Sequence, residues 1–266
     1  MPRPSERLLG TRPLSALPRA ASVADLMTAQ HDCILVLDEG GNGLPGYLSD
    51  IGDRPYVLAL RDAQVIPGKM LHLPAGIDPD RRFRLPGDMK GVGKQIVVTA
   101  DGHLLQDSFT RSHQVHPRLV PEGAGWRTGY AARMPRQRGT TLFAELITGH
   151  FGHALVDTTA RLWPFAHDPL PDLGRALAGL PICGMGLGKV RGPNAGWSPY
   201  VRMLMTGCGA DVDRAALLDG PVQFDRLLIP RRISPLFGVA GPAWLRMMQR
   251  AGDHMMAVAG ATEPGT

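Results

Sequence analysis

Short apolar runs separated by turn-forming residues fill the first half of the chain. The runs at 34–37, 56–60 and 95–99 are rich in valine, leucine and isoleucine and have the length of strands. The stretches between them contain glycine, proline and Asp-Gly or Asn-Gly pairs, which favour tight turns. We therefore expect a β-rich region over residues 30–138.

The clearest helical pattern covers residues 140–166. Within it, His153, Asp157 and Arg161 follow one another at intervals of four residues. Four residues turn an α-helix by about 400°, so these side chains are expected to form one polar stripe beside an apolar face. Pro164 is expected to end the helix, because its ring and missing N–H cannot continue the hydrogen-bond ladder.

Elements of both kinds follow this helix. Residues 173–180 and 198–206 predict short helices, and 224–230 predicts a buried strand after a turn. Alternating helices and strands indicate an α/β fold class, here a β-rich N-terminal region followed by a lobe over residues 139–258.

The two ends of the chain carry weaker patterns. Residues 1–29 are expected to be a flexible leader broken by prolines, with one short helix at 22–30 that Ser22 caps, and residues 259–266 a loose tail. The leader lacks the apolar core of a signal peptide, and no apolar run approaches the roughly 18 residues that span a bilayer. These patterns predict a cytoplasmic protein without a transmembrane segment.

Composition narrows the choice of ligand. The 266 residues are 44% hydrophobic, enough for a buried core, and only four of the 29 basic residues are lysines. Arginine binds phosphate and carboxylate bidentately, so this excess suits an anionic ligand such as a sugar nucleotide, although a GC-rich genome produces the same excess. The basic residues are spread along the chain without a run of five or six like charges, so no nucleic-acid partner is indicated. The three cysteines lack Cys-x-x-Cys spacing, so neither a disulfide framework nor a cysteine zinc site is expected.

The polar stripe of the predicted helix allows three interpretations. In the first, Asp157 and Arg161 form an ordinary ion pair one turn apart, and His153 only satisfies the start of the helix. In the second, the helix N-terminus keeps the His153 imidazole neutral, which suits a general base or a hydrogen-bond donor to a sugar. In the third, Glu145, His150, His153 and Asp157 bind a metal, but they match no signature such as H-E-x-x-H, so no metal is expected.

Two further motifs are interpreted as loops. CGMGLGKVRGPNAG, residues 183–196, lacks the Ser or Thr that follows the lysine of a phosphate-binding loop, because Val190 stands there. His113 and His116 have the spacing of a metal pair, but Pro117 and the lack of nearby cysteines favour a surface loop.

Two segments resemble glycosyltransferase family 61. GHFGHALVDTTARLW, residues 149–163, is similar to that family's His-containing helix, with its histidine, acidic residue and arginine in the same order and spacing. SPYVRMLMTGCGADVDRAALLDGPVQFDRLLIP, residues 198–230, is similar to the family segment in which a helix and a leucine-leucine-glycine turn precede a strand ending in proline. The resemblance covers about residues 149–250.

The resemblance implies an inverting transfer of a sugar from a nucleotide-sugar donor to a glycan acceptor. Family members have a GT-B architecture of two Rossmann-like lobes, and bacterial members serve capsular or extracellular polysaccharide biosynthesis. Residues 139–258 are then expected to be one such lobe, and no cofactor is expected. The implied catalytic residues are His153 and Asp157, the implied substrate contacts are His150 and Arg161, and the implied nucleotide contacts, directly after a strand end, are Arg231 and Arg232.

The length of the chain departs from the family pattern. In the family a second lobe follows the strand, whereas here about 36 residues follow Pro230. The chain is therefore expected to be a one-lobed fragment, to work with a partner chain, or to have lost catalysis. The alternative function is a non-catalytic carbohydrate-binding or accessory protein, and a metal-dependent hydrolase comes third.

Overall fold

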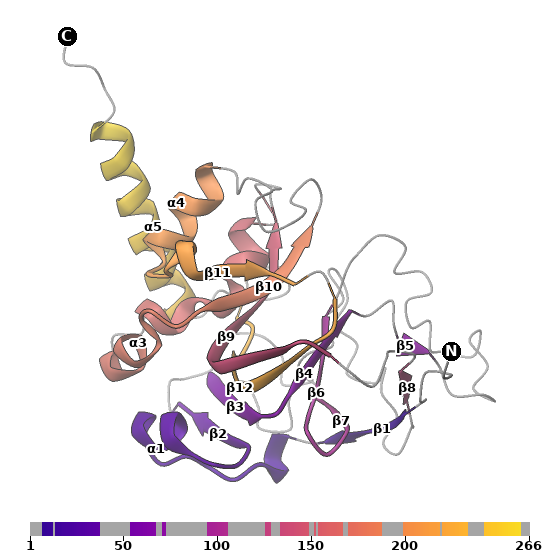
Figure 1. Ribbon diagram of the computed structural model, residues 1–266. Coiled ribbons are helices and arrows are strands. Elements are labelled where there is room, and N and C mark those ends of the chain that lie inside the picture. The colour runs from indigo at the N-terminus through magenta and orange to yellow at the C-terminus, as the bar shows by residue number, and fades with distance from the viewer. Residues whose placement is uncertain are drawn as a thin grey trace, which may run out of the picture.

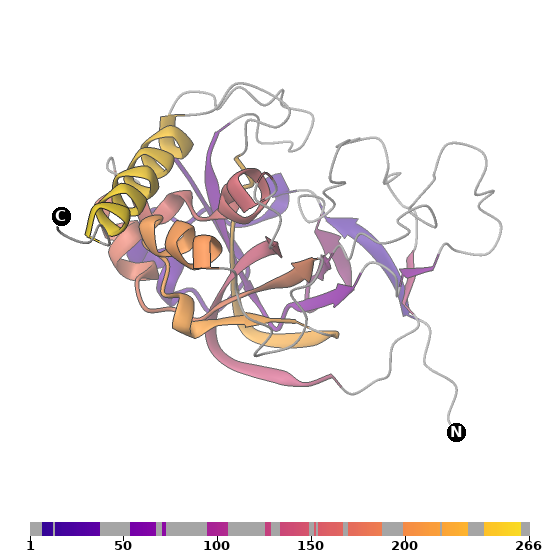
Figure 2. The same ribbon diagram turned by 90° about the horizontal axis from the view of Figure 1, so that it is seen from above.

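The computed structural model describes the greater part of the chain, which is coloured in Figure 1. The described residues are 7–12, 14–37, 54–67, 71–72, 95–105, 126–128, 134–148, 152, 154–166, 170–187, 199–218, 220–233 and 242–261. They form a mixed α/β structure in which helices pack against a mixed sheet (Figures 1 and 2).

Four neighbouring parallel strands form the part of the sheet that positions the site. In spatial order they are β11 (Ala215–Leu217), β10 (Ile182–Leu187), β9 (Arg136–Thr148) and β12 (Val222–Pro230). In chain order they are third, second, first and fourth, so the strand order reverses between β9 and β12. Helix α3 (Pro171–Leu177) lies on the connection from β9 to β10, and α4 (Pro199–Gly207) lies on the connection from β10 to β11.

Beyond β12 the sheet continues mainly with antiparallel strands. β3 (Tyr56–Arg61) and β4 (Gln64–Pro67) both pair with β12, and β2 (Cys33–Val36) pairs with β3. From β4 the sheet runs through β6 (Gln95–Val98), β7 (His103–Leu105), β1 (Arg7–Arg12), β8 (Trp126–Thr128) and β5 (Leu71–His72).

The predicted boundary between a β-rich region and a separate lobe does not divide this sheet. Residues 138 and 139 both lie inside β9, and β12 of the predicted lobe pairs with β3 of the predicted β-rich region. Strand pairing joins segments that lie far apart in the chain. The change in sequence pattern near residue 138 therefore does not coincide with an edge of the sheet. The described residues of both regions share one sheet.

The expected flexible leader is wrong for the residues described there. β1 lies in the sheet, and it is followed by the 3-10 turn Leu14–Ala16 and by α1 (Val23–Thr28). Leu14 and Leu26 are buried, because they cover apolar faces of the sheet that water would otherwise contact.

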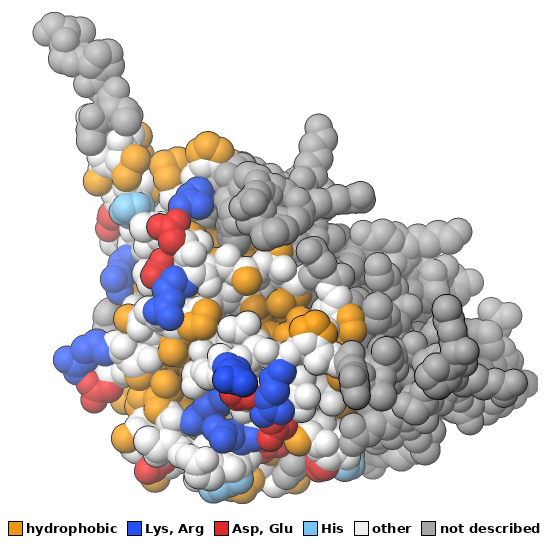
Figure 3. Space-filling model, in the orientation of Figure 1, with side chains coloured by type: hydrophobic (Ala, Val, Ile, Leu, Met, Phe, Trp, Pro, Cys, Tyr) orange, Lys and Arg blue, Asp and Glu red, His pale blue; other side chains and the backbone are white. Residues whose placement is uncertain are grey.

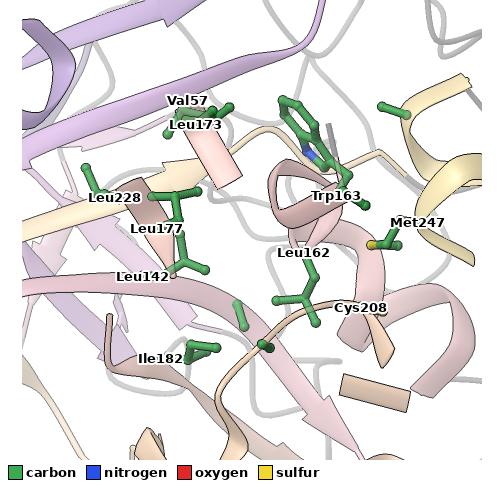
Figure 4. Close-up of a cluster of buried hydrophobic side chains, with 14 of the residues drawn as sticks. Val57, Leu142, Leu162, Trp163, Leu173, Leu177, Ile182, Cys208, Leu228 and Met247 are labelled. Carbon is green, nitrogen blue, oxygen red and sulfur yellow. The ribbon is translucent and has the colours of Figure 1, made fainter. Parts of the chain in front are cut away.

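Alternation along β9 and β12 divides their apolar side chains between two faces. Leu142 and Leu228 lie in a core that also contains side chains of α1, α3, α4 and α5 (Pro242–Ala261). Phe143 and Leu227, their neighbours in the chain, lie in a second core on the opposite face. Figure 4 shows the first core, in which the buried Trp163 lies between the strands and α5.

Most of the other elements predicted from local pattern are confirmed. The predicted strands at 34–37, 56–60, 95–99 and 224–230 correspond to β2, β3, β6 and β12, and the predicted helices at 173–180 and 198–206 to α3 and α4. Ser22 caps α1 as expected, its Oγ accepting a hydrogen bond from Asp25 N at 3.1 Å. Helix α5 continues to Ala261, and residues 262–266 of the expected tail lie outside the described part.

The helix predicted over residues 140–166 is wrong. Residues up to Thr148 belong to β9, and a π-helical turn, Ala154–Thr158, and two 3-10 turns, Thr159–Arg161 and Trp163–Ala166, follow. A strand covered on both faces is apolar almost continuously, so its apolar residues also match helical spacing. Pro164 lies within the second 3-10 turn rather than ending a helix.

Candidate functional site

A β-bulge near the carboxyl end of β9 places the first residue of the site. Cys183 of β10 is level with Phe143, but Gly184 is level with Glu145, so Ala144 is an extra residue in β9. Glu145 has a φ of 67°, a left-handed conformation that residues with a side chain rarely adopt. Such a conformation costs about 1–3 kcal/mol and persists only where the surroundings fix it.

Gly184 is required beside this bulge. A Cβ at Gly184 would lie 2.9 Å from the Ile147 side chain and 3.3 Å from the carbonyl oxygen of Glu145. The glycine therefore lets β10 approach the distorted stretch of β9 closely, and bulges of this kind redirect a side chain.

The Glu145 carboxylate lies between two arginines that come from different parts of the chain. Its Oε2 is 2.9 Å from Nε of Arg161, and its Oε1 is 3.4 Å from Nη1 of Arg232. The Arg161 side chain is fully buried, whereas the side chains of Glu145 and Arg232 each keep 10% of their surface exposed. The network is thus closed at Arg161 and slightly exposed at both Glu145 and Arg232.

Residues 160–163 hold the chain where it leaves β12. The Arg161 guanidinium donates through Nη1 to the carbonyl oxygen of Pro230, the last residue of β12. Trp163 Nε1 donates to the carbonyl oxygen of Arg231 at 2.8 Å, and Ile233 N donates to the carbonyl oxygen of Ala160 at 2.9 Å. The Ala-Arg-Leu-Trp stretch that ends the family-like motif therefore acts as a clamp on residues 230–233.

Arg231 and Arg232, although adjacent, make different contacts. Arg231 Nη1 donates to the carbonyl oxygen of Arg54 at 2.8 Å, and its guanidinium lies 5.7 Å from the centre of the Tyr56 ring. Its side chain is fully buried beside β3, while that of Arg232 contacts Glu145. Of the two expected nucleotide contacts, only Arg232 therefore contacts Glu145 through its side chain.

The network lies at the carboxyl ends of β9 and β12, where the strand order reverses. In open α/β sheets, ligands bind outside the carboxyl ends of the strands at such a reversal. His150 and His153 follow the end of β9 directly in the chain, and the glycine-rich residues 188–196 follow the end of β10. In the described part of the chain, the ends of β9, β10 and β12 lie at this same edge of the sheet.

Three of the six predicted site residues, Arg161, Arg231 and Arg232, are described with their side chains, and the structure brings two of them, Arg161 and Arg232, to one carboxylate. Arg161 and Arg232 share Glu145, and the Arg231 carbonyl is held by Trp163. His150 and His153 lie outside the described residues, as does the side chain of Asp157, whose backbone lies in the π-helical turn. The loop at 188–196 and the pair His113 and His116 also lie outside them.

Arg161 does not take the place in a surface stripe that spacing by four residues predicts for it. The prediction assumed α-helical geometry throughout, whereas Asp157 lies in a π-helical turn and Arg161 in a 3-10 turn. The two turn types rotate the chain by different angles per residue, so even spacing in sequence does not align side chains in space. Arg161 points inward to Glu145 instead of lining a surface.

Glu145 is the residue that sequence reasoning considered only as a metal ligand. Its signal was an acidic residue inside the apolar run from Leu142 to Ile147. A carboxylate buried in such a strand is costly unless it is paired with a positive charge, which predicts a basic partner from elsewhere in the chain.

Other chemistries find little support among the described residues. No group of three or more His, Cys, Asp or Glu side chains gathers there as a metal site would require. The three cysteines are buried, and burial raises the pKa of the Cys208 thiol to about 12 and that of Cys183 still further, so these thiols are protonated at neutral pH.

The surface shown in Figure 3 is mixed in charge. Basic and acidic side chains alternate over its described part, with apolar side chains between them, and no single-sign patch spreads across it. Arg136, for example, is hydrogen-bonded to both Asp62 and Asp225. The described surface in this view therefore lacks a basic stripe of the kind that binds nucleic acid.

Comparison with known proteins leaves the site to be interpreted from its own chemistry. No protein-family model, curated protein or solved structure matches this chain. No helix among the described residues is long and apolar enough to cross a membrane. What the site offers is an arginine at the carboxyl edge of parallel strands, held by a buried carboxylate and a clamped backbone.

Proposed function

We propose that this chain is a glycosyltransferase-like protein that takes part in polysaccharide biosynthesis by transferring a sugar, with inversion, from a nucleotide-sugar donor to a glycan acceptor. The proposal rests on one observation. The Arg161–Glu145–Arg232 network fastens the segment that resembles family 61 to the end of β12. That junction lies at the sheet edge where nucleotides bind in open α/β folds.

The order of the parallel strands supports a Rossmann-like lobe. From β11 to β12 the parallel strands are third, second, first and fourth in chain order. The first four strands of a dinucleotide-binding sheet have the same order. The link from β11 to β12 departs from that fold, because residues 218–221 join these strands without a helix. In the proposed GT-B arrangement, a second lobe or partner chain supplies the other wall of the donor site.

The proposed residues divide into groups that touch the substrates and groups that position them. Arg232 binds the diphosphate of the donor, since its side chain keeps 10% of its surface exposed just after the end of β12 and a guanidinium suits a phosphate group. Arg161 is a positioning residue, because its buried guanidinium bonds to Glu145 and Pro230. His153 and Asp157 are the proposed catalytic residues, on the segment between β9 and the clamp.

The proposed transfer is a single displacement. The acceptor hydroxyl oxygen forms a bond to the anomeric carbon as the bond from that carbon to the phosphate oxygen breaks. The hydroxyl proton passes to His153 or Asp157, and the nucleoside diphosphate leaves with the electron pair of the broken bond. Arg232 stabilises the negative charge that develops on the leaving group.

Release of nucleoside diphosphate by the purified full-length chain tests this proposal. The protein is incubated with a panel of UDP-, GDP-, CDP- and dTDP-sugars, with and without oligosaccharide acceptors. Turnover is expected with at least one donor, and His153→Ala and Asp157→Asn are expected to lower it by at least about tenfold. Asp172→Asn is the matched control, because Asp172 is exposed on α3 and pairs only with Arg175 among the described contacts.

The outcomes separate the candidate functions. Unchanged turnover in both variants would remove His153 and Asp157 from the site. Oligosaccharide binding without affinity for any nucleotide would instead support the non-catalytic accessory protein. Stoichiometric metal in the purified chain, found by elemental analysis, would favour the hydrolase.

A further inference from the structure

The two bonds of Glu145 are unequal. Its contact with Arg161 Nε is 2.9 Å long, an ordinary charged hydrogen bond, whereas its contact with Arg232 Nη1 is 3.4 Å. Arg161 is also held by Pro230 and is fully buried, while Arg232, like Glu145, keeps 10% of its side chain exposed. The bond to Arg232 is therefore the one that a competing ligand breaks more readily.

The carboxylate itself is fixed. The bulge and the left-handed backbone of Glu145 set the direction of its side chain, and Arg161 holds one of its oxygens. The backbone around Arg232 is fixed as well, because Arg231 N donates to the carbonyl oxygen of Tyr56 and Ile233 N to that of Ala160. A change of partner by Arg232 would therefore involve its side chain and not its backbone.

We infer that Glu145 is an internal counter-ion that a diphosphate group of the ligand replaces at Arg232, while Glu145 keeps its bond to Arg161. The inference rests on the proposed nucleotide site. A diphosphate carries more negative charge than one carboxylate and offers a guanidinium two parallel hydrogen bonds. In the ligand-free protein, the Glu145 carboxylate places a negative charge beside the nearly buried Arg232 guanidinium, which offsets part of the cost of burying that charge.

Inorganic pyrophosphate is the probe, because it needs no choice of base or sugar. Its dissociation constant is measured by titration calorimetry for the full chain and for two variants. Glu145→Gln removes the competing charge but keeps an acceptor for Arg161, so it is expected to lower the dissociation constant roughly five- to tenfold. Arg232→Gln is expected to raise the dissociation constant by at least about tenfold.

Asp225→Asn is the matched control. It removes the same charge from the chain, but Asp225 lies near the amino-terminal ends of β9 and β12, where it bonds to Arg136 and Gly139 N. Its effect on the dissociation constant is expected to stay below about twofold, because solvent and salt screen charges at that distance.

The results distinguish this inference from the proposed function. Unchanged or weaker pyrophosphate binding in Glu145→Gln, with binding intact in the unmodified chain, would overturn the counter-ion role and leave the proposed function standing. If the unmodified chain binds neither pyrophosphate nor any nucleoside diphosphate, both fail. If Glu145→Gln does not fold by circular dichroism, Glu145→Asn replaces it, since asparagine tolerates a left-handed backbone, and the same tightening is expected.

Discussion

Replacing Arg161 by methionine tests whether the buried ion network holds the site together. The substitution keeps an unbranched side chain of similar length and removes the guanidinium. Glu145 then loses its 2.9 Å bond to Arg161 and is left with the longer, 3.4 Å contact with Arg232, and the carbonyl oxygen of Pro230 loses a donor. Because Arg161 is fully buried, water cannot replace these bonds without opening the core.

The expected loss of stability is large. Breaking a buried ion pair by removing one partner costs about 3–5 kcal/mol, and the remaining contact with Arg232 places this case at the lower end. The carbonyl oxygen left without its donor adds about 1 kcal/mol. The two losses together are expected to lower the free energy of unfolding by about 4 kcal/mol. That is a large share of the roughly 5–15 kcal/mol typical of a folded protein.

Urea unfolding followed by circular dichroism measures this loss from the midpoint and slope of the transition. The double variant Arg161→Met with Glu145→Gln is expected to lose about 1–3 kcal/mol less than the sum of the single losses, because removing both members of the Arg161–Glu145 pair leaves neither of these two charges without the other. Arg175→Met, whose exposed guanidinium pairs with Asp172 on α3, is the control and is expected to change stability by less than about 0.5 kcal/mol. A loss below about 1 kcal/mol for Arg161→Met, or strict additivity in the double variant, would refute the reasoning.

Four further predictions concern the surroundings of the site and the rest of the fold. Gly184→Ala is expected to lower the free energy of unfolding, measured by urea unfolding, by about 1–3 kcal/mol, because the added Cβ would overlap neighbouring atoms. Gly220→Ala is the control in the same assay, because open space surrounds Gly220. Trp163→Phe keeps an aromatic ring but loses the bond to the Arg231 carbonyl, so thermal unfolding should show a loss of about 1–3 kcal/mol, and an unchanged midpoint would argue against the clamp. The three buried cysteines are expected to react with a thiol reagent only when urea unfolds the chain, and rapid reaction of the native protein would contradict their burial. Hydrogen bonds from Arg136 and Gly139 lower the pKa of Asp225 in the folded protein. The contribution of Asp225 to stability is therefore present above the pKa of the unfolded state and is lost as the pH falls through the lowered pKa. Asp225→Asn should flatten the decline of the melting temperature between about pH 5 and 2.

The candidate site was only partly visible in the sequence. The motif pointed to Arg161, and the position after a strand end pointed to Arg231 and Arg232. Neither signal indicated that Arg161 and Arg232 share one carboxylate. Glu145 lies 16 residues before Arg161 and 87 before Arg232. No local pattern links residues at such separations, because the register of β9 against β12 and the bulge at Ala144 decide whether they meet.

The sequence by itself determined the local elements: the strands β3 and β12, the helices α3 and α4, and the Ser22 cap. Side-chain periodicity and capping depend on neighbours a few residues away, and those neighbours are written in the chain. Only the tertiary structure decided that 140–148 is a strand, that the leader joins the sheet, and that Arg161 turns inward. Each of these depends on which distant surface covers an apolar or charged group, and burial of that kind arises only when the whole chain has packed.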